Sequence, residues 1–252
     1  MKTRLLFAAL SVSITACAVD STNDTTTTDD TSGSHQEKLA ANALSPEDLA
    51  ASGITAAKLT QTVVNTVSAT REGRAALYYL VNCAMPSTYS ITGQYNCHPV
   101  TGVCQTATYV GGINLVPTWT ASNLNQTAQR TLSGCVLGRM NEYSRSVTVS
   151  LRGAGYTMDS GEAASHIYPE GVFFGNLFPG SDNYWGACDS DGPTHVDRQC
   201  AQPGHCSVDN TGLSSCATAC SLDASGNATS CVGANGKTYA NPTTVFLDAV
   251  SP

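Results

Sequence analysis

The sequence predicts an α+β fold: a single disulfide-rich domain with two main helices, a few strands and a Cys-rich loop region. Two long segments have the apolar spacing of amphipathic helices, and shorter segments have the patterns of strands, without a repeated βαβ order. The chain also contains 11 cysteines, of which ten lie after residue 80. Such an even set is typical of a disulfide framework formed in an oxidising compartment.

The N-terminal residues have the order of a secretory signal peptide. Their apolar run is shorter than the roughly 20 residues that a membrane-spanning helix needs. Residues 14–17 (ITAC) resemble the lipobox of bacterial lipoproteins, which implies a signal peptide over residues 1–16 and lipidation of Cys17. We therefore expect attachment to the membrane through an N-terminal lipid, and Ala18 favours the outer membrane. Cleavage after Ala18 is the alternative, and would release a secreted soluble protein.

A tether and a domain follow the signal peptide. Residues 17–36 are expected to form the lipidated Cys and a disordered Thr/Asp-rich tether, because they contain almost no large apolar side chain. Residues 37–252 are expected to form the Cys-rich α+β domain. The formal net charge of −7 argues against binding to nucleic acid.

Helix signals dominate the first half of the domain. A Ser-Pro-Glu-Asp sequence at residues 45–48 predicts the start of a short helix. Residues 70–85 have apolar side chains at helical spacing, and Pro86 ends the segment. These side chains are Leu77, Leu80, Val81 and Ala84. A second helix is predicted from Ser122 to residue 141, with one face formed by Leu124, Ala128, Leu132, Cys135, Val136 and Met140.

Strand signals follow in the second half. Residues 145–152 alternate apolar and polar side chains, which predicts a half-buried strand. Residues 172–178 (VFFGNLF) are the most hydrophobic part of the domain and are expected at the centre of the fold. Residues 243–247 predict a closing strand.

The predicted disulfide framework comprises Cys83, Cys97, Cys104, Cys135, Cys188, Cys200, Cys206, Cys216, Cys220 and Cys231. Its connectivity cannot be read from the sequence. A local Cys97–Cys104 bridge is plausible, and so is pairing of each with a distant cysteine. No pair of CxxC motifs is present, so the sequence predicts no metal site and no cofactor.

Four stretches resemble a group of Cys-rich exported bacterial proteins, some of them lipoproteins, to which no activity is assigned. They are residues 79–86 (YLVNCAMP), 128–141 (AQRTLSGCVLGRMN), 147–153 (VTVSLRG) and 170–178 (EGVFFGNLF). The resemblance implies export and a shared fold, and it names no function.

Residues 181–192 (SDNYWGACDSDG) form the first candidate binding site. Its candidate ligand-binding residues are Asp182, Tyr184, Trp185, Asp189 and Asp191. The acids alone suggest a calcium site, but they lack the order of a complete calcium loop. An exposed Tyr-Trp pair beside acids is instead suited to bind a sugar or a peptide. The alternative is a polar loop whose aromatic rings cover the disulfide of Cys188.

The sequence contains residue types that could act in catalysis, but no catalytic motif identifies them. Ser160 precedes His166, but no G-x-S-x-G is present and the flanks of Ser160 do not match the G-D-S-G-G of chymotrypsin-like proteases. Glu162 and Glu170 are a possible acid/base pair. A cysteine nucleophile would need one of the histidines, and the even count leaves no obvious spare thiol; the histidines are His98, His166, His195 and His205.

Residues 231–241 (CVGANGKTYAN) resemble the core of Kazal protease inhibitors. Thr243 stands where that motif has its next Cys, so we expect a turn and a strand here. The function expected from the sequence is therefore a tethered envelope domain that binds an extracellular glycan or protein. An extracytoplasmic hydrolase is the alternative.

Overall fold

The computed structural model describes residues 36–39, 46–140, 147–180, 182–190 and 215–248. Its helices are α1 (Pro46–Ala51), α2 (Gln61–Ser68), α3 (Arg71–Ala84), η1 (Pro117–Thr120), α4 (Gln126–Arg139), α5 (Glu162–Ser165) and α6 (Cys216–Ala219). Its strands are β1 (Gln36–Leu39), β2 (Ser90–Tyr95), β3 (Gln105–Val110), β4 (Val147–Arg152), β5 (His166–Asn176), β6 (Tyr184–Asp189), β7 (Cys220–Leu222), β8 (Ala228–Val232), β9 (Thr238–Ala240) and β10 (Thr243–Asp248).

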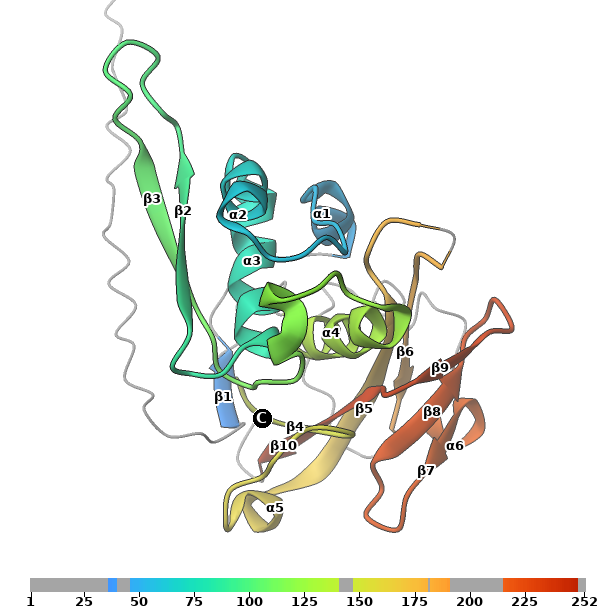
Figure 1. The fold of residues 1–252 in the computed structure, drawn as a ribbon. Coiled ribbons are helices and arrows are strands. Elements are labelled where there is room, and N and C mark those ends of the chain that lie inside the picture. Colours follow the sequence, from blue (N-terminus) through green and yellow to red (C-terminus); the bar gives the residue numbers. More distant parts are fainter. Residues whose placement is uncertain (1–35, 40–45, 141–146, 181, 191–214, 249–252) are drawn as a thin grey trace, which may run out of the picture. The chain divides into compact units, whose positions relative to one another are not determined.

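A five-stranded antiparallel sheet in the order β1-β4-β10-β5-β6 forms the base of the domain (Figure 1). The predicted closing strand, β10, lies in its middle, between β4 and β5. Gln36, the last residue assigned to the tether from the sequence, already belongs to β1, where it pairs with Ser150. The mixed helices and strands confirm the predicted α+β class.

Helix α4 covers one face of this sheet, and α3 packs on α4, to which it is joined by the Cys83–Cys135 disulfide. Helix α4 lies directly on β5 and β10 because Gly134 has no side chain there. A Cβ at Gly134 would stand 3.0 Å from the Thr243 hydroxyl oxygen and 3.1 Å from the Phe173 carbonyl oxygen. This close approach buries most of α4 on nearly all sides.

The α3 prediction is confirmed. The Thr70 hydroxyl oxygen accepts a hydrogen bond from the Gly73 N–H at 2.9 Å and so caps the N-terminus. The four predicted apolar side chains are buried, and Pro86 follows the last turn. Helix α4 begins later than predicted, because Asn125 rather than Ser122 provides its cap, accepting from the Ala128 N–H at 2.9 Å.

Strand β4 differs from its prediction as a half-buried strand, because two of its polar residues, Ser150 and Arg152, are buried too. The Ser150 hydroxyl donates to Glu162 at 2.6 Å, and Arg152 Nε donates to Ser150 at 3.0 Å. All three side chains are at most 7% exposed. A buried hydrogen-bonded network therefore covers the face that alternation alone assigned to solvent.

The other face of the sheet carries a small three-stranded sheet in the order β7-β8-β9. Here Val172 and Phe174 of β5 pack against Tyr239 and the disulfides Cys188–Cys216 and Cys220–Cys231. We call this group the second core, and the larger apolar interior around α3 and α4 the main core. The turn and strand predicted for residues 231–241 are confirmed by β8, β9 and the turn between them.

The β2–β3 hairpin packs against α2 and α3 (Figure 1). Its tip is closed by the Cys97–Cys104 disulfide, so the local bridge is confirmed. Eight cysteines of the predicted framework thus form four disulfides, as expected of a chain that folds in an oxidising, extracytoplasmic compartment. Cys200, Cys206 and Cys17, like most of the predicted signal peptide and tether, lie outside the described residues. No helix among the described residues is long and apolar enough to cross a membrane.

Candidate functional site

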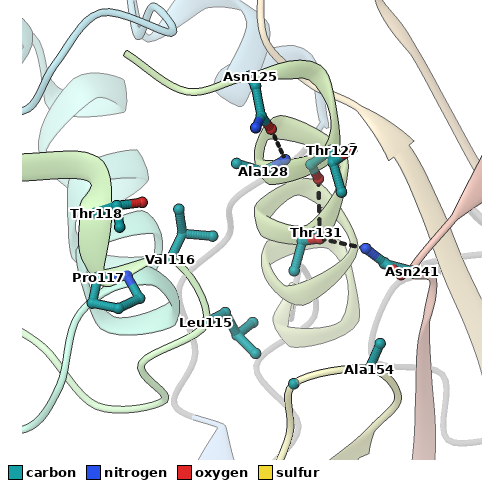
Figure 2. A pocket seen from close by; sticks show the side chains of 11 residues that line it. Leu115, Val116, Pro117, Thr118, Asn125, Thr127, Ala128, Thr131, Ala154 and Asn241 are labelled. Atoms are coloured by element: carbon teal, nitrogen blue, oxygen red, sulfur yellow. Dashed lines mark hydrogen bonds between the residues drawn. The ribbon is translucent and has the colours of Figure 1, made fainter. Parts of the chain in front are cut away.

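A cavity of about 450 Å³ lies between the segment before α4 and the N-terminal half of α4 (Figure 2). It is lined by Leu115, Val116, Pro117, Thr118, Asn125, Thr127, Ala128, Thr131, Ala154, Gly155 and Asn241. This volume is within the range of small-molecule sites, roughly 300–1,000 Å³. Four separate parts of the sequence therefore build one hollow.

The wall formed by residues 115–118 is fixed by the end of α3. The N–H groups of Leu115 and Val116 donate to the carbonyl oxygens of Cys83 and Ala84 at 3.0 and 2.9 Å. Carbonyls in the last turn of a helix have no partner within the helix, so these bonds satisfy them. Trp119 anchors the same segment, because its buried indole N–H donates to the Ala57 carbonyl at 2.9 Å. The apolar wall is therefore pre-formed.

The opposite wall carries hydroxyl and amide groups. In Figure 2, Asn125 at the N-cap of α4 and Thr127 and Thr131 within α4 lie on this wall, and Asn241 approaches from the β9–β10 turn. The Thr131 hydroxyl donates to the Thr127 carbonyl at 3.0 Å and accepts from the Asn241 amide at 3.3 Å. These bonds hold the side chains in place.

Several polar groups of the lining remain available for a ligand. Within the described part of the chain, no hydrogen bond engages the amide nitrogen of Asn125, the amide oxygen of Asn241 or the hydroxyls of Thr118 and Thr127. They supply both donors and acceptors. The site is therefore suited to a polar group that needs both.

The lining of the cavity is uncharged. None of its lining residues is ionisable. Residues 75–129, which form one wall and part of the other, contain no Asp, Glu, Lys or Arg. A charged ligand would lose its hydration here without meeting an opposite charge. The arrangement favours a neutral ligand.

The residues predicted as a binding loop occupy a different place, in and around β6 rather than in a loop. Tyr184 stacks on Tyr239, with ring centroids 5.2 Å apart, and its hydroxyl accepts from the Ala234 N–H at 2.9 Å. Trp185 is half-buried against the main core. Asp189 ends β6, and Asp191 lies outside the described residues. One face of the Tyr184 ring is therefore already in contact with protein.

Asp182 is the centre of a charged group, which we call the Asp182 cluster, with Gln126, Arg130, Lys237 and Tyr239. Arg130 donates to one Asp182 oxygen through Nε at 3.0 Å and a terminal nitrogen at 2.8 Å, and Gln126 donates to it at 3.2 Å. Lys237 reaches the other oxygen at 3.2 Å. The Arg130 guanidinium also lies over the Tyr239 ring, 4.8 Å from its centroid. These contacts tie α4 to the β8–β9 turn.

This environment lowers the pKa of the Asp182 carboxyl. Burial alone raises its pKa, but the hydrogen bonds and positive charges of Arg130 and Lys237 outweigh that effect, and the pKa lies below its ordinary value. Asp182 is therefore a carboxylate that is ion-paired with Arg130 and Lys237.

Among the described residues, those nominated for hydrolysis are not assembled as a catalytic set. His166 Nδ1 hydrogen-bonds to Ser165 at 2.9 Å, whereas no hydrogen bond joins His166 to Ser160. Glu162 is buried and engaged by Ser150 and the Asp159 N–H, and Glu170 is buried in β5. His98 Nδ1 accepts from two backbone N–H groups in the hairpin tip. His195 and His205 lie outside the described residues.

The cysteines offer neither a thiol nor a metal site in the described part of the chain. All eight cysteines there are in disulfides. Among those residues the one group with metal-ligand spacing is Cys188, Cys216 and Cys220, whose sulfurs lie within 4.8 Å of one another. Because they are oxidised, they are not thiolate ligands.

The cavity was missed from the sequence because no motif marks it. Its residues are small and neutral, and they are drawn from positions 115 to 241. The absence of charge over residues 75–129 was the available signal. Comparisons of the chain with protein-family models, characterised proteins and solved structures give no significant match.

Proposed function

We propose that this protein is an exported, lipid-anchored domain that binds a neutral glycan unit in the cavity between residues 115–118 and α4. The observation that carries the proposal is the uncharged cavity, with an apolar wall facing a wall of hydroxyl and amide groups. An N-acetylated sugar has the complementary chemistry: a methyl group and ring C–H groups for the apolar wall, and hydroxyls and an amide for the polar wall.

The location rests on the N-terminal sequence and on the disulfides. A basic and apolar leader, the ITAC sequence and a Thr/Asp-rich stretch are the order of a tethered outer-membrane lipoprotein. The four disulfides support folding outside the cytoplasm. Incorporation of a labelled fatty acid tests the anchor: it should be lost in Cys17→Ser, and labelling that persists in this variant would contradict lipidation at Cys17.

The binding test uses N,N′-diacetylchitobiose as the neutral probe and N-acetylneuraminic acid as the charged one. Titration followed by NMR should show saturable binding of the neutral probe, with shifts at the cavity residues, and much weaker binding of the charged probe. Ala154→Trp places an indole in the cavity from an exposed position and should weaken binding about tenfold or more.

The matched control is Ala121→Trp, which adds the same side chain at an exposed alanine outside the lining. It should bind like the unchanged protein. Absence of saturable binding by the neutral sugar, or equal binding by Ala154→Trp, would overturn the proposal. Binding of an uncharged acetylated dipeptide amide in place of the sugar would overturn the glycan class.

The hydrolase alternative has less support. The described cysteines are oxidised, and the candidate acid Glu162 is held inside a buried network. No described group combines a free nucleophile with a hydrogen-bonded histidine base at the cavity.

A further inference from the structure

The two edges of the β2–β3 hairpin differ in their hydrogen bonds to the rest of the protein. Strand β2 faces α2, and β3 is the outer strand in Figure 1, with α3 contacting only part of it: Asn82 donates to the Val110 carbonyl at the C-terminal end of β3 at 3.4 Å. On the β2 side, Gln61 of α2 donates to the Thr92 carbonyl at 2.6 Å, and the Gln94 N–H donates to Asn65 at 3.0 Å. Side chains of α2 therefore complete the backbone hydrogen bonds of this edge.

These bonds fix which backbone groups point outwards. Since Thr92 and Gln94 turn their backbone groups to α2, their cross-strand pairs with Thr108 and Thr106 are the non-hydrogen-bonded pairs of the ladder. The N–H and C=O groups of Thr106 and Thr108 consequently point away from β2. Within the described residues, no hydrogen bond engages them.

The β3 edge also lacks the features that normally prevent strand pairing. Natural sheets protect open edges with charged residues, prolines or bulges. Strand β3 has none of these: its sequence is QTATYV, and its register with β2 is continuous. The nearest charged residues in the sequence are Arg74 and Arg130.

The hairpin is rigid enough to act as a template. The Cys97–Cys104 disulfide closes its tip. Its inner face is fixed to α2 by the hydrogen bond of 2.7 Å between the Ser68 and Tyr109 hydroxyls, and a Cβ at Gly93 would stand 2.1 Å from the Ser68 oxygen. A partner strand would therefore meet an ordered edge.

We propose that β3 pairs with β3 of a second copy of this chain across a twofold axis. The axis passes beside Ala107, so that Thr106 of one copy exchanges two hydrogen bonds with Thr108 of the other, and the reverse. The result is a continuous four-stranded antiparallel sheet. It extends a two-stranded ribbon, which is marginally stable by itself.

The lack of charge on this edge suits a second copy of the chain as the occupant. A twofold interface sets each patch against itself, so any charge on it meets a like charge. The whole chain carries a net charge of −7, yet this edge carries none. Two copies of this edge can therefore meet without charge repulsion, whereas two copies of a charged surface would repel each other. Its small area predicts a weak dimer.

The test is sedimentation velocity of the full mature chain from micromolar to submillimolar concentration, comparing Thr108→Pro with Thr92→Pro. Each substitution lies in the same non-hydrogen-bonded pair and removes one outward N–H, so the hairpin ladder stays intact. Only Thr108→Pro acts on the open edge. It should weaken self-association roughly thirtyfold, because the twofold axis removes two hydrogen bonds at once.

Thr92→Pro should associate like the unchanged protein, and circular dichroism checks that both variants are folded. Thr108→Lys provides a second test without a proline, because it brings two positive charges close together at the axis and should also weaken association. A monomer at all concentrations would overturn the proposal. So would undiminished association of Thr108→Pro, or equal loss in Thr92→Pro.

Discussion

The two faces of the five-stranded sheet are stabilised by different interactions. The face towards α3 and α4 carries a large apolar interior, the main core, with a single disulfide between the two helices. The opposite face carries only the small second core under the β7-β8-β9 sheet, with two disulfides and the Asp182 cluster at its margin. Neighbouring residues of β5 divide between them, since Phe173 enters the main core and Phe174 the second.

This difference follows from how much apolar area each layer buries. Burial contributes about 25 cal/mol per Å² of apolar surface, so a layer of two helices can be stabilised by packing alone. A three-stranded sheet with short strands buries too little, and small layers of this kind need covalent or ionic links. We therefore expect the main core to respond most to truncation, and the second core to cysteine exchange and pH.

The largest expected effect is that of Phe173→Ala. The ring is 2% exposed, and the alanine leaves a cavity under α4, which should lower the free energy of unfolding by about 4 kcal/mol. Phe174→Ala should cost less, about 3 kcal/mol, because the second core has fewer apolar neighbours to lose. Urea unfolding measures both. Ile167→Ala, at an exposed position of the same strand, is the control and should change stability little. An equal or larger loss in Phe174→Ala would contradict the comparison.

The next effect concerns the two disulfides of the second core, which lie close enough to exchange partners. The sulfurs of Cys188 and Cys220, from different bridges, are 3.6 Å apart. In the variant with Cys216→Ser and Cys231→Ser, the remaining Cys188 and Cys220 should therefore join. Peptide mapping by mass spectrometry should detect the new bridge between residues 32 apart in sequence.

The complementary variant, with Cys188→Ser and Cys220→Ser, is the control. Its remaining cysteines in the second core are Cys216 and Cys231. Of these, only Cys216 belongs to the group of three close sulfurs, so both should stay reduced. Closing a loop of this length in the first variant should make it more stable than the control by about 3 kcal/mol. Free thiols in both variants would show that the sulfurs of the second core are held apart.

The sequence was most informative where local signals and burial agree. Thr70 and Pro86 bound α3 because a capping hydroxyl and a proline act on neighbouring residues alone. The Cys97–Cys104 bridge is likewise local, since turn residues lie between its two cysteines. The alternation in β4 correctly indicated a strand, but it could not show that Glu162 would form a buried hydrogen bond with Ser150 on its polar side.

The surroundings of Tyr184 and Trp185 and the cavity depend on tertiary contacts between distant parts of the chain. Tyr184 and Trp185 resemble an exposed aromatic platform in sequence, yet Tyr239, far along the chain, stacks on Tyr184. The cavity depends on carbonyls at the end of α3 that position residues 115 and 116. No periodicity encodes such a contact, because it joins a helix end to a segment about 30 residues later.

The smallest expected effect belongs to the Asp182 cluster, which links the two faces around the β6 edge. Asp182→Asn should cost about 1 kcal/mol at neutral pH, the usual scale for a partly exposed ion pair. The pKa of this carboxyl is lowered from its ordinary value of 3.8, so its contribution to stability is present above pH 4 and is lost as the pH falls through the lower folded-state pKa. The stability difference between Asp182→Asn and the unchanged protein should therefore vanish in acid.

Urea unfolding at neutral pH and below pH 3 measures this difference, with Asp159→Asn as the control at an exposed carboxylate. That control should unfold like the unchanged protein at neutral pH. Hydrogen exchange adds a test of location: because Arg130 and Lys237 lose their common partner, amides of β8 and β9 should exchange faster in Asp182→Asn, while those of α3 stay protected. Uniform acceleration in both layers would mean that the Asp182 cluster stabilises the main core as well, and that the two faces are not independent.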